Sequence, residues 1–274
     1  MRGHLPIAVT ACLLLAGAAG CGGAGQEEGG GAPRTAEAAG AAGANGVAEL
    51  GPRRIAERAG KVLADTPSLR AVVRTPDVGT ADLTADDRGN CAGTMFGGGD
   101  GGDGGDGGDG AARLVRRGGT VWVRPNDAYW EFIGEAGDSA RAKRELLGGR
   151  YIRGPADPDE AVYGQVALLC DLTLLTGELI AAVLESDTLT KGSPTEVGGV
   201  RAVPVTGTSE GGATTLFVAL DGEPRPVRLT RKGDGGTETY ELRDYGRPVP
   251  EGVPSRGESL DEAELLGADG TGLT

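Results

Sequence analysis

Apolar side chains recur along the chain first at the spacing of a helix and then at the spacing of strands. Between residues 52 and 66 they fall three or four positions apart, at Ile55, Ala59, Val62 and Leu63. Pro52 suits a first helical turn, because its missing N–H needs no partner there. The pattern predicts one amphipathic helix over residues 52–66, with its apolar stripe packed on the rest of the domain.

Short segments of alternating polarity, separated by turn residues, follow this helix and predict an antiparallel meander. They span residues 68–75, 80–85, 90–96, 112–117 and 120–124. The same pattern returns at residues 188–191, 195–197, 200–206, 214–220, 225–231 and 237–244. Pro204 lies within one of these segments, and its missing N–H favours an edge strand or a bulge there.

The middle of the chain changes to a helical pattern. Residues 126–136 and 139–147 form two such segments, and residues 159–185 are the most apolar stretch after the N-terminal segment. We expect two short helices within residues 159–185, with a break near residues 170–173. Helices grouped between two sets of antiparallel strands predict an α+β fold.

Two segments flank this pattern with few bulky apolar residues, too few to fold by themselves. Residues 21–50 are rich in Gly, Ala and Glu and are expected to be a flexible tether. Residues 247–274 are rich in Pro, Gly and acids, which predicts an extended or disordered low-complexity tail with a brief helix at 260–266. The folded domain is therefore expected over residues 51–246.

A glycine-rich run interrupts the first set of strands at residues 97–110. It carries four acids at a period of three, at Asp100, Asp103, Asp106 and Asp109. Calcium loops place their ligands two residues apart and close with a bidentate acid. We therefore interpret the run as an expanded hairpin loop kept soluble by its charges, and we expect no metal site or cofactor.

The N-terminal twenty residues have the organisation of an export signal. Arg2 precedes an apolar run at residues 5–15, which is too short to cross a bilayer, and small residues lead into Cys21. Residues 18–21 resemble the bacterial lipobox, although Ala18 stands where that motif usually has Leu. The resemblance implies that residues 1–20 are removed and that Cys21 receives a diacylglycerol. The alternative is an ordinary cleaved signal followed by a coincidental cysteine.

Composition narrows the possible functions further. The 274 residues have a formal net charge of −13, which argues against nucleic acid or anionic lipid headgroups as partners. The one histidine, His4, lies within the predicted signal, so Ser-His-Asp catalysis and His-based zinc sites are excluded for the processed chain. Paired carboxylates could still act as in glycosidases, but the acids are too many for any one pair to be informative. An enzyme is therefore not expected.

Cys91 and Cys170 remain after Cys12 leaves with the signal and Cys21 is lipidated. Two cysteines in an exported chain predict a disulfide. The alternative is two buried free thiols. Two thiols without histidine would not hold zinc.

Several stretches together resemble actinobacterial lipoproteins related to the LolA/LppX/LprG superfamily. They are NCAGTM at residues 90–95, VWVRPNDAYW at 121–130, LLCDL at 168–172, LTKGSPTEVGGVRAVPVT at 189–206 and TLFVALDGEPRPVRL at 215–229. The resemblance implies a curved antiparallel sheet, an incomplete β-barrel, whose concave side is covered by helices. It also implies uptake of lipid acyl chains between sheet and helices, for transport within the envelope.

Two functions from different classes follow from these observations. The first is a membrane-anchored carrier of a lipid or other hydrophobic ligand, with a pocket near Trp122, Trp130, Phe132 and Leu169. These side chains could equally be ordinary core anchors. The second function is an envelope interaction module with a solid core, which would recognise a protein partner through its surface. A His-free hydrolase ranks far behind both.

Overall fold

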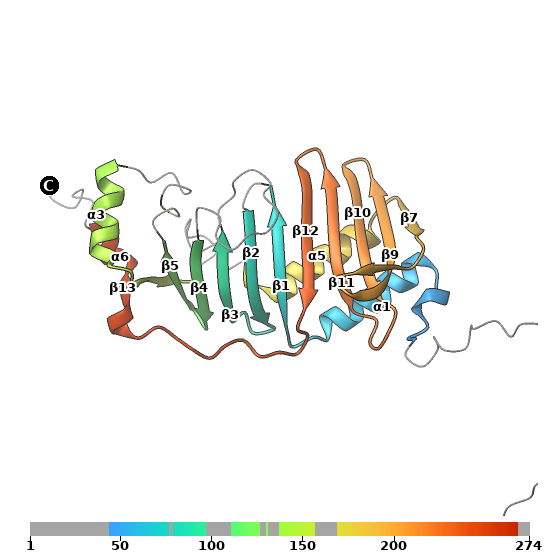
Figure 1. Cartoon of the computed structure of the whole chain (residues 1–274), viewed down its shortest axis with the longest axis horizontal. Coiled ribbons are helices and arrows are strands. Elements are labelled where there is room, and N and C mark those ends of the chain that lie inside the picture. The colour runs from blue at the N-terminus through green and yellow to red at the C-terminus, as the bar shows by residue number, and fades with distance from the viewer. Residues whose placement is uncertain are drawn as a thin grey trace, which may run out of the picture. The chain divides into compact units, whose positions relative to one another are not determined.

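A sheet of thirteen strands runs through the described part of the chain and does not close on itself (Figure 1). The computed structural model describes residues 44–76, 79–96, 111–126, 130, 137–156 and 169–267. All of them belong to one unit spanning Gly40–Thr274, and residues 1–39 form a separate unit outside the described residues.

The strand order places the second half of the chain beside the first strand. The order is β13-β6-β5-β4-β3-β2-β1-β12-β11-β10-β9-β7, and β8 pairs with β9. All pairs are antiparallel except that of β13 with β6. The strands are β1 Ser68–Thr75, β2 Gly79–Asp86, β3 Cys91–Phe96, β4 Ala111–Arg117, β5 Thr120–Pro125, β6 Tyr151–Pro155, β7 Thr188–Lys191, β8 Thr195–Val197, β9 Val200–Ser209, β10 Gly212–Ala219, β11 Pro226–Gly233, β12 Gly236–Arg243 and β13 Ser259–Asp261.

Two helices pack against one face of this sheet. α1 (Pro52–Ala64) and α5 (Leu172–Leu184) contact each other and the strands β9 and β10 (Figure 1). At the other end of the sheet, α3 (Gly137–Leu147) contacts α6 (Glu262–Gly267), which follows β13. The 3-10 turns η1 (Val47–Glu49) and η2 (Arg256–Glu258) complete the elements that the structure describes.

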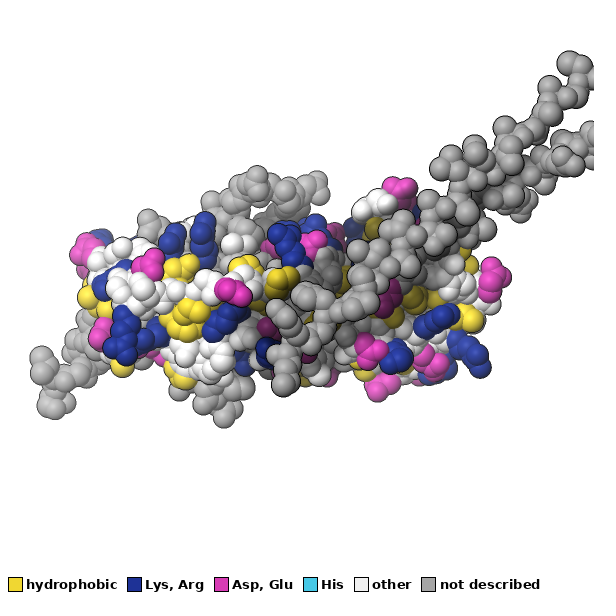
Figure 2. Space-filling model, turned by 90° about the horizontal axis from the view of Figure 1, so that it is seen from below, with side chains coloured by type: hydrophobic (Ala, Val, Ile, Leu, Met, Phe, Trp, Pro, Cys, Tyr) yellow, Lys and Arg dark blue, Asp and Glu magenta, His cyan; other side chains and the backbone are white. Residues whose placement is uncertain are grey.

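The core lies between the helices and the sheet because each strand points alternate residues to that side. In β1 the inward side chains are Leu69, Ala71 and Val73, and all three are buried. α5 contributes a stripe at helical spacing, formed by Leu172, Thr176, Leu179 and Val183. Viewed from below, the surface carries basic and acidic side chains close together with hydrophobic ones between them (Figure 2).

Most of the predicted elements are confirmed within one to three residues at each end. The α1 helix, the first five strands and the strands from β7 to β12 all lie where the polarity pattern predicted them. The break near residues 170–173 is also present, because Asp171 caps the start of α5 by accepting a 2.9 Å hydrogen bond from the Leu174 N–H. The loop at 97–110, most of the segment 126–136 and residues 157–168 lie outside the described residues.

Two flanking segments are more structured than the sequence indicated. Val47, expected in the tether, is fully buried in the core, and the Asn45 side chain donates a 2.8 Å hydrogen bond to the Ala219 carbonyl. At the other flank, β13 in the expected tail pairs with β6, which the polarity pattern also missed. Both strands are short, at three and five residues, so neither shows a clear alternation.

Pro204 does not lie in an edge strand, and the ladder of β9 with β10 runs through it without a bulge. It lies where the outer partner of β9 changes. β8 ends its pairing at Ala202 and β7 begins at Val205, so no ladder requires an N–H from Pro204 on that side. Its carbonyl accepts a 3.0 Å hydrogen bond from the Gly192 N–H.

Candidate functional site

A groove of about 630 Å³ lies between α1 and α5. Its lining is mainly apolar or small, from Gly60, Leu63, Ala64, Leu172, Gly177, Ile180, Ala181 and Leu184. Polar residues also line it, at Glu57, Lys61, Thr66, Asp87, Thr173, Thr176 and Glu185. Ligand sites in proteins are typically apolar concavities of roughly 300–1,000 Å³ with a few polar groups, and this groove falls within that class.

The groove exists because the two helices touch closely at one place and separate at another. A Cβ added to Gly60 would lie 2.9 Å from Cγ2 of Ile180, so only glycine allows this approach. A Cβ added to Gly177 would meet no atom within 4 Å. The Arg53 side chain donates a 3.1 Å hydrogen bond to the Leu184 carbonyl and connects the start of α1 to the end of α5.

Three of the seven polar side chains of the groove have partners within their own helix or turn. The hydroxyl of Thr176 donates to the Leu172 carbonyl at 2.7 Å, and that of Thr66 donates to the Val62 carbonyl at 2.7 Å. Lys61 donates to Asp65 at 2.7 Å, and this hydrogen bond raises the pKa of the Lys61 ammonium. The lining therefore offers a hydrophobic ligand an apolar surface in which these three polar groups are already satisfied.

The described residues contain no cluster of three or more metal-ligating side chains. In the same part of the chain, no helix is long and apolar enough to cross a bilayer. The arrangement around the groove thus offers apolar binding.

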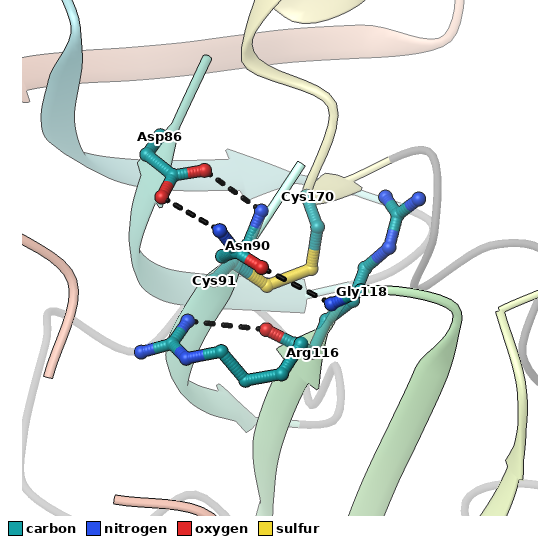
Figure 3. The surroundings of a disulfide bond; sticks show 7 residues. Asp86, Asn90, Cys91, Arg116, Gly118 and Cys170 are labelled. Carbon is teal, nitrogen blue, oxygen red and sulfur yellow. Dashed lines mark hydrogen bonds between the residues drawn. A yellow bond between two sulfur atoms is a disulfide. The ribbon is translucent and has the colours of Figure 1, made fainter. Parts of the chain in front are cut away.

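The predicted disulfide between Cys91 and Cys170 is present (Figure 3). Both cysteines are fully buried, and their Cα atoms lie 5.4 Å apart. Cys170 directly precedes Asp171, the cap of α5, so the bond fixes the start of that helix to β3. The disulfide therefore holds one wall of the groove in place.

A small polar network supports the β3 end of this bond (Figure 3). The Asn90 side chain donates to Asp86 at 2.9 Å and accepts from the Gly118 N–H at 3.1 Å. The Asn90 N–H also donates to Asp86, at 2.8 Å. These hydrogen bonds connect two hairpin turns beside Cys91 and fix the strand that carries it.

The predicted pocket residues lie in different environments where the structure describes them. Trp130 is buried in the core cluster, and Leu169 packs against it. Trp122 is also buried but lies outside that cluster, because strand alternation turns it away from the inward Val121 and Val123. None of these three predicted residues lines the groove between α1 and α5, and Phe132 lies outside the described residues.

The groove was missed because its residues looked like ordinary helix residues. Two signals could have indicated it. Gly60 interrupts an otherwise strong amphipathic helix, and α5 carries apolar residues around most of its circumference with one charge, Glu178. A helix that is apolar all round needs a partner on more than one side.

The architecture is that of an open, mostly antiparallel curved sheet with helices against one face, an α+β class. Among solved structures, LprF from Mycobacterium bovis is similar, with 16% identity, coverage of 74% of this chain and 97% of that one, and a TM-score of 0.52. The lipoprotein LppX from Mycobacterium tuberculosis matches with 12% identity, 73% and 97% coverage, and a TM-score of 0.46. The likeness to LprF confirms the predicted fold.

No family model matches the sequence. A search of curated proteins likewise finds no match. What the groove binds must therefore be argued from its own residues.

Proposed function

We propose that this chain is a non-catalytic binder or carrier of a hydrophobic ligand, and that an acyl chain or similar apolar group lies in the groove between α1 and α5. The observation that carries the proposal is the groove itself, about 630 Å³ with mainly apolar lining. Exclusion of water from its exposed Leu and Ile surface would drive binding, at about 25 cal/mol per Å² buried.

We further propose that the carrier is anchored on the extracytoplasmic face of a membrane through a lipid on Cys21. The support is the order of charge, apolar run, small residues and cysteine at residues 2–21. Two acyl chains give stable anchoring where one is marginal. Cys21→Ala should therefore leave the protein unprocessed or release it from the membrane, and a processed variant that still fractionates with membranes would contradict the anchor.

The groove is tested by blocking it. Gly177→Phe places a ring where a Cβ meets nothing, and Glu178→Phe places the same ring on the exposed next position of α5 as a control. With a fluorescent fatty acid as probe, we expect Gly177→Phe to weaken binding at least about tenfold and Glu178→Phe to leave it within about threefold. Equal binding by both variants would place the ligand elsewhere.

A protein partner is the second candidate, because Leu174 on α5 is 41% exposed and could extend an apolar docking surface. Native mass spectrometry of protein purified from its own membrane separates the two functions. A co-purified lipid mass that is lost in Gly177→Phe supports the carrier. Purification without any lipid, together with no binding of the fatty-acid probe, supports the interaction module.

A further inference from the structure

The face of the sheet opposite the helices carries an arginine-rich area on β4, β5 and β6. These three strands contain five arginines and no acidic residue. Four of the arginines lie on this outer face by strand alternation, and we call them the arginine face: Arg113, Arg117, Arg124 and Arg153. The fifth, Arg116, pairs in register with the buried Cys91 and turns toward the core side.

We propose that the arginine face docks onto a membrane surface of anionic phospholipids. The four arginines are positively charged, whereas the whole protein has a formal net charge of −13. The attraction to anionic headgroups is therefore local to this part of one face. The inference is independent of what the groove binds, and relies on the proposed function only for placing the chain next to a membrane.

On the other half of the same face, acidic side chains neutralise the arginines. Arg70 bonds to Asp82 of the neighbouring strand at 2.5 Å. Glu241 on β12 lies within salt-bridge distance of three arginines, at 3.3 Å from Arg74, 3.0 Å from Arg228 and 3.7 Å from Arg243. Every outer arginine of β1, β11 and β12 thus has an acidic partner, either on a neighbouring strand or on the same strand.

The arginine face is compensated only in part, because Arg113 and Arg117 have no acidic partner among the described residues. Arg153 has an acid, Asp261 of β13, at 2.7 Å, and Arg124 lies close enough to Glu258 to help lower the pKa of that carboxyl. Arg117 donates to the carbonyls of Arg116 and Pro250, and Arg124 lies 5.5 Å from the ring centre of Tyr151. Arg113 is exposed and makes no hydrogen bond or ion pair to any described residue.

Arg113 and Arg124 are cross-strand partners, directly opposite each other. Like charges in that position destabilise a sheet. The cost is relieved when an anion binds between them, because each phosphate can accept hydrogen bonds from a guanidinium. Glu258 offsets part of this cost at Arg124, and Arg113 has no acidic partner among the described residues, so an anionic partner would relieve the remainder.

The spread of the four arginines favours an extended surface over a small molecule. Neighbouring strands are about 4.8 Å apart, and residues on one face repeat about every 6.8 Å, so the four arginines are distributed over three strands of one sheet face. Trp122 lies in register between Val115 and Arg153 and is buried, so the arginines supply the exposed contacts of this area. Cations distributed over an extended face suit headgroups presented side by side in a membrane.

Vesicle flotation tests the proposal with the chain from Gly22 onward, which keeps the whole unit that begins at Gly40 and carries no lipid. We expect binding to vesicles containing phosphatidylglycerol, weaker binding as salt is raised, and no binding to pure phosphatidylcholine. Each arginine near an anionic surface contributes roughly fivefold to binding. The double substitution Arg113→Glu with Arg124→Glu should therefore weaken binding by about 25-fold or more. Arg113→Lys with Arg124→Lys should retain most of it, which separates charge from misfolding.

The matched control reverses two arginines elsewhere. Arg54 and Arg58 are exposed on α1, so Arg54→Glu with Arg58→Glu changes the net charge equally and should leave binding within about threefold. Three results would overturn the proposal: no binding of the unmodified chain to anionic vesicles, equal loss in both double variants, or equal binding to phosphatidylcholine. The first combined with capture of an acidic peptide would identify a protein partner instead, and the groove would be unaffected in each case.

Discussion

Gly60 of α1 lies directly against Ile180 of α5, so closely that a Cβ at residue 60 would stand 2.9 Å from the Ile180 Cγ2. This contact sets the distance between the two helices at residue 60. Gly177, which lines the same groove, has open space instead. The two glycines therefore lie in opposite surroundings: the helices are in contact at Gly60, and there is open space beside Gly177.

Substitutions at these glycines should have opposite effects on stability. Gly60→Val must push Ile180 or the whole of α5 aside, which typically costs about 1–3 kcal/mol. Gly177→Ala should stabilise the protein by about 0.5–1 kcal/mol, because glycine is unfavourable in a helix interior. Urea unfolding of both variants is the measurement. A Gly60→Val protein as stable as the wild type would mean that the helices are not held in contact at this position.

The disulfide should make a large contribution to stability. It joins residues 79 apart in sequence, and closing a loop of this length is worth about 4–5 kcal/mol in the chain-entropy model. Cys91→Ala with Cys170→Ala should therefore lower the free energy of unfolding by several kcal/mol and loosen the start of α5. Unfolding with and without reductant measures the effect.

Mass spectrometry provides an independent check of the bond. Denaturing alkylation without reductant should add no alkyl group at Cys91 or Cys170, and two should be added after reduction. Alkylation of both residues before reduction would contradict the disulfide.

Alternation and turn residues made most of the strands predictable, because each strand has one face on the core and one on solvent. The groove was not predictable, since it depends on a distance between two helices that are far apart in sequence. Trp122 shows the same limit. Its size and chemistry suggested a pocket, but its place in the register of β5 turns it to the outer face.

The segments flanking the domain were underestimated for a different reason. Val47 and Leu50 are the two bulky apolar residues in a run of Gly, Ala and polar residues, and two residues are too few to establish a period. Its burial depends on the Asn45 N–H, which donates to the Leu220 carbonyl at 2.9 Å. Hydrogen bonds between residues this far apart in sequence cannot be inferred from composition.

Stability should fall at high pH because of two tyrosines. Burial raises the pKa of Tyr240 to about 12, with a further contribution from its hydrogen bond to Glu238. Burial also raises the pKa of Tyr245, whose hydroxyl donates to the Pro226 carbonyl at 2.6 Å. In the unfolded chain a tyrosine has a pKa of about 10. The folded state therefore keeps its protons longer, and its stability is full below pH ~10 and is lost as the pH rises toward ~12.

Urea unfolding at a series of pH values between about 8 and 11.5 tests this expectation. Tyr240→Phe should flatten the decline, because the variant has no proton to lose at that position. Tyr151→Phe is the control, because Tyr151 is only half-buried on β6 and its ring lies beside Arg124. A decline of equal slope in the Tyr240 and Tyr151 variants would show that other groups cause it.

Removal of residues 256–274 should destabilise the domain and promote self-association. The segment contains β13, which covers the outer edge of β6, and its Leu260 and Leu265 are buried in the core cluster. Losing them costs about 1.5–3 kcal/mol each, and an uncovered strand edge is a template for pairing with another chain. Arg153 would also lose Asp261, its partner at 2.7 Å. Light scattering and urea unfolding measure both effects, with removal of residues 268–274 as the control. If the chain stays monomeric and equally stable after the longer deletion, β13 is not needed to protect the edge of β6 or to stabilise the domain.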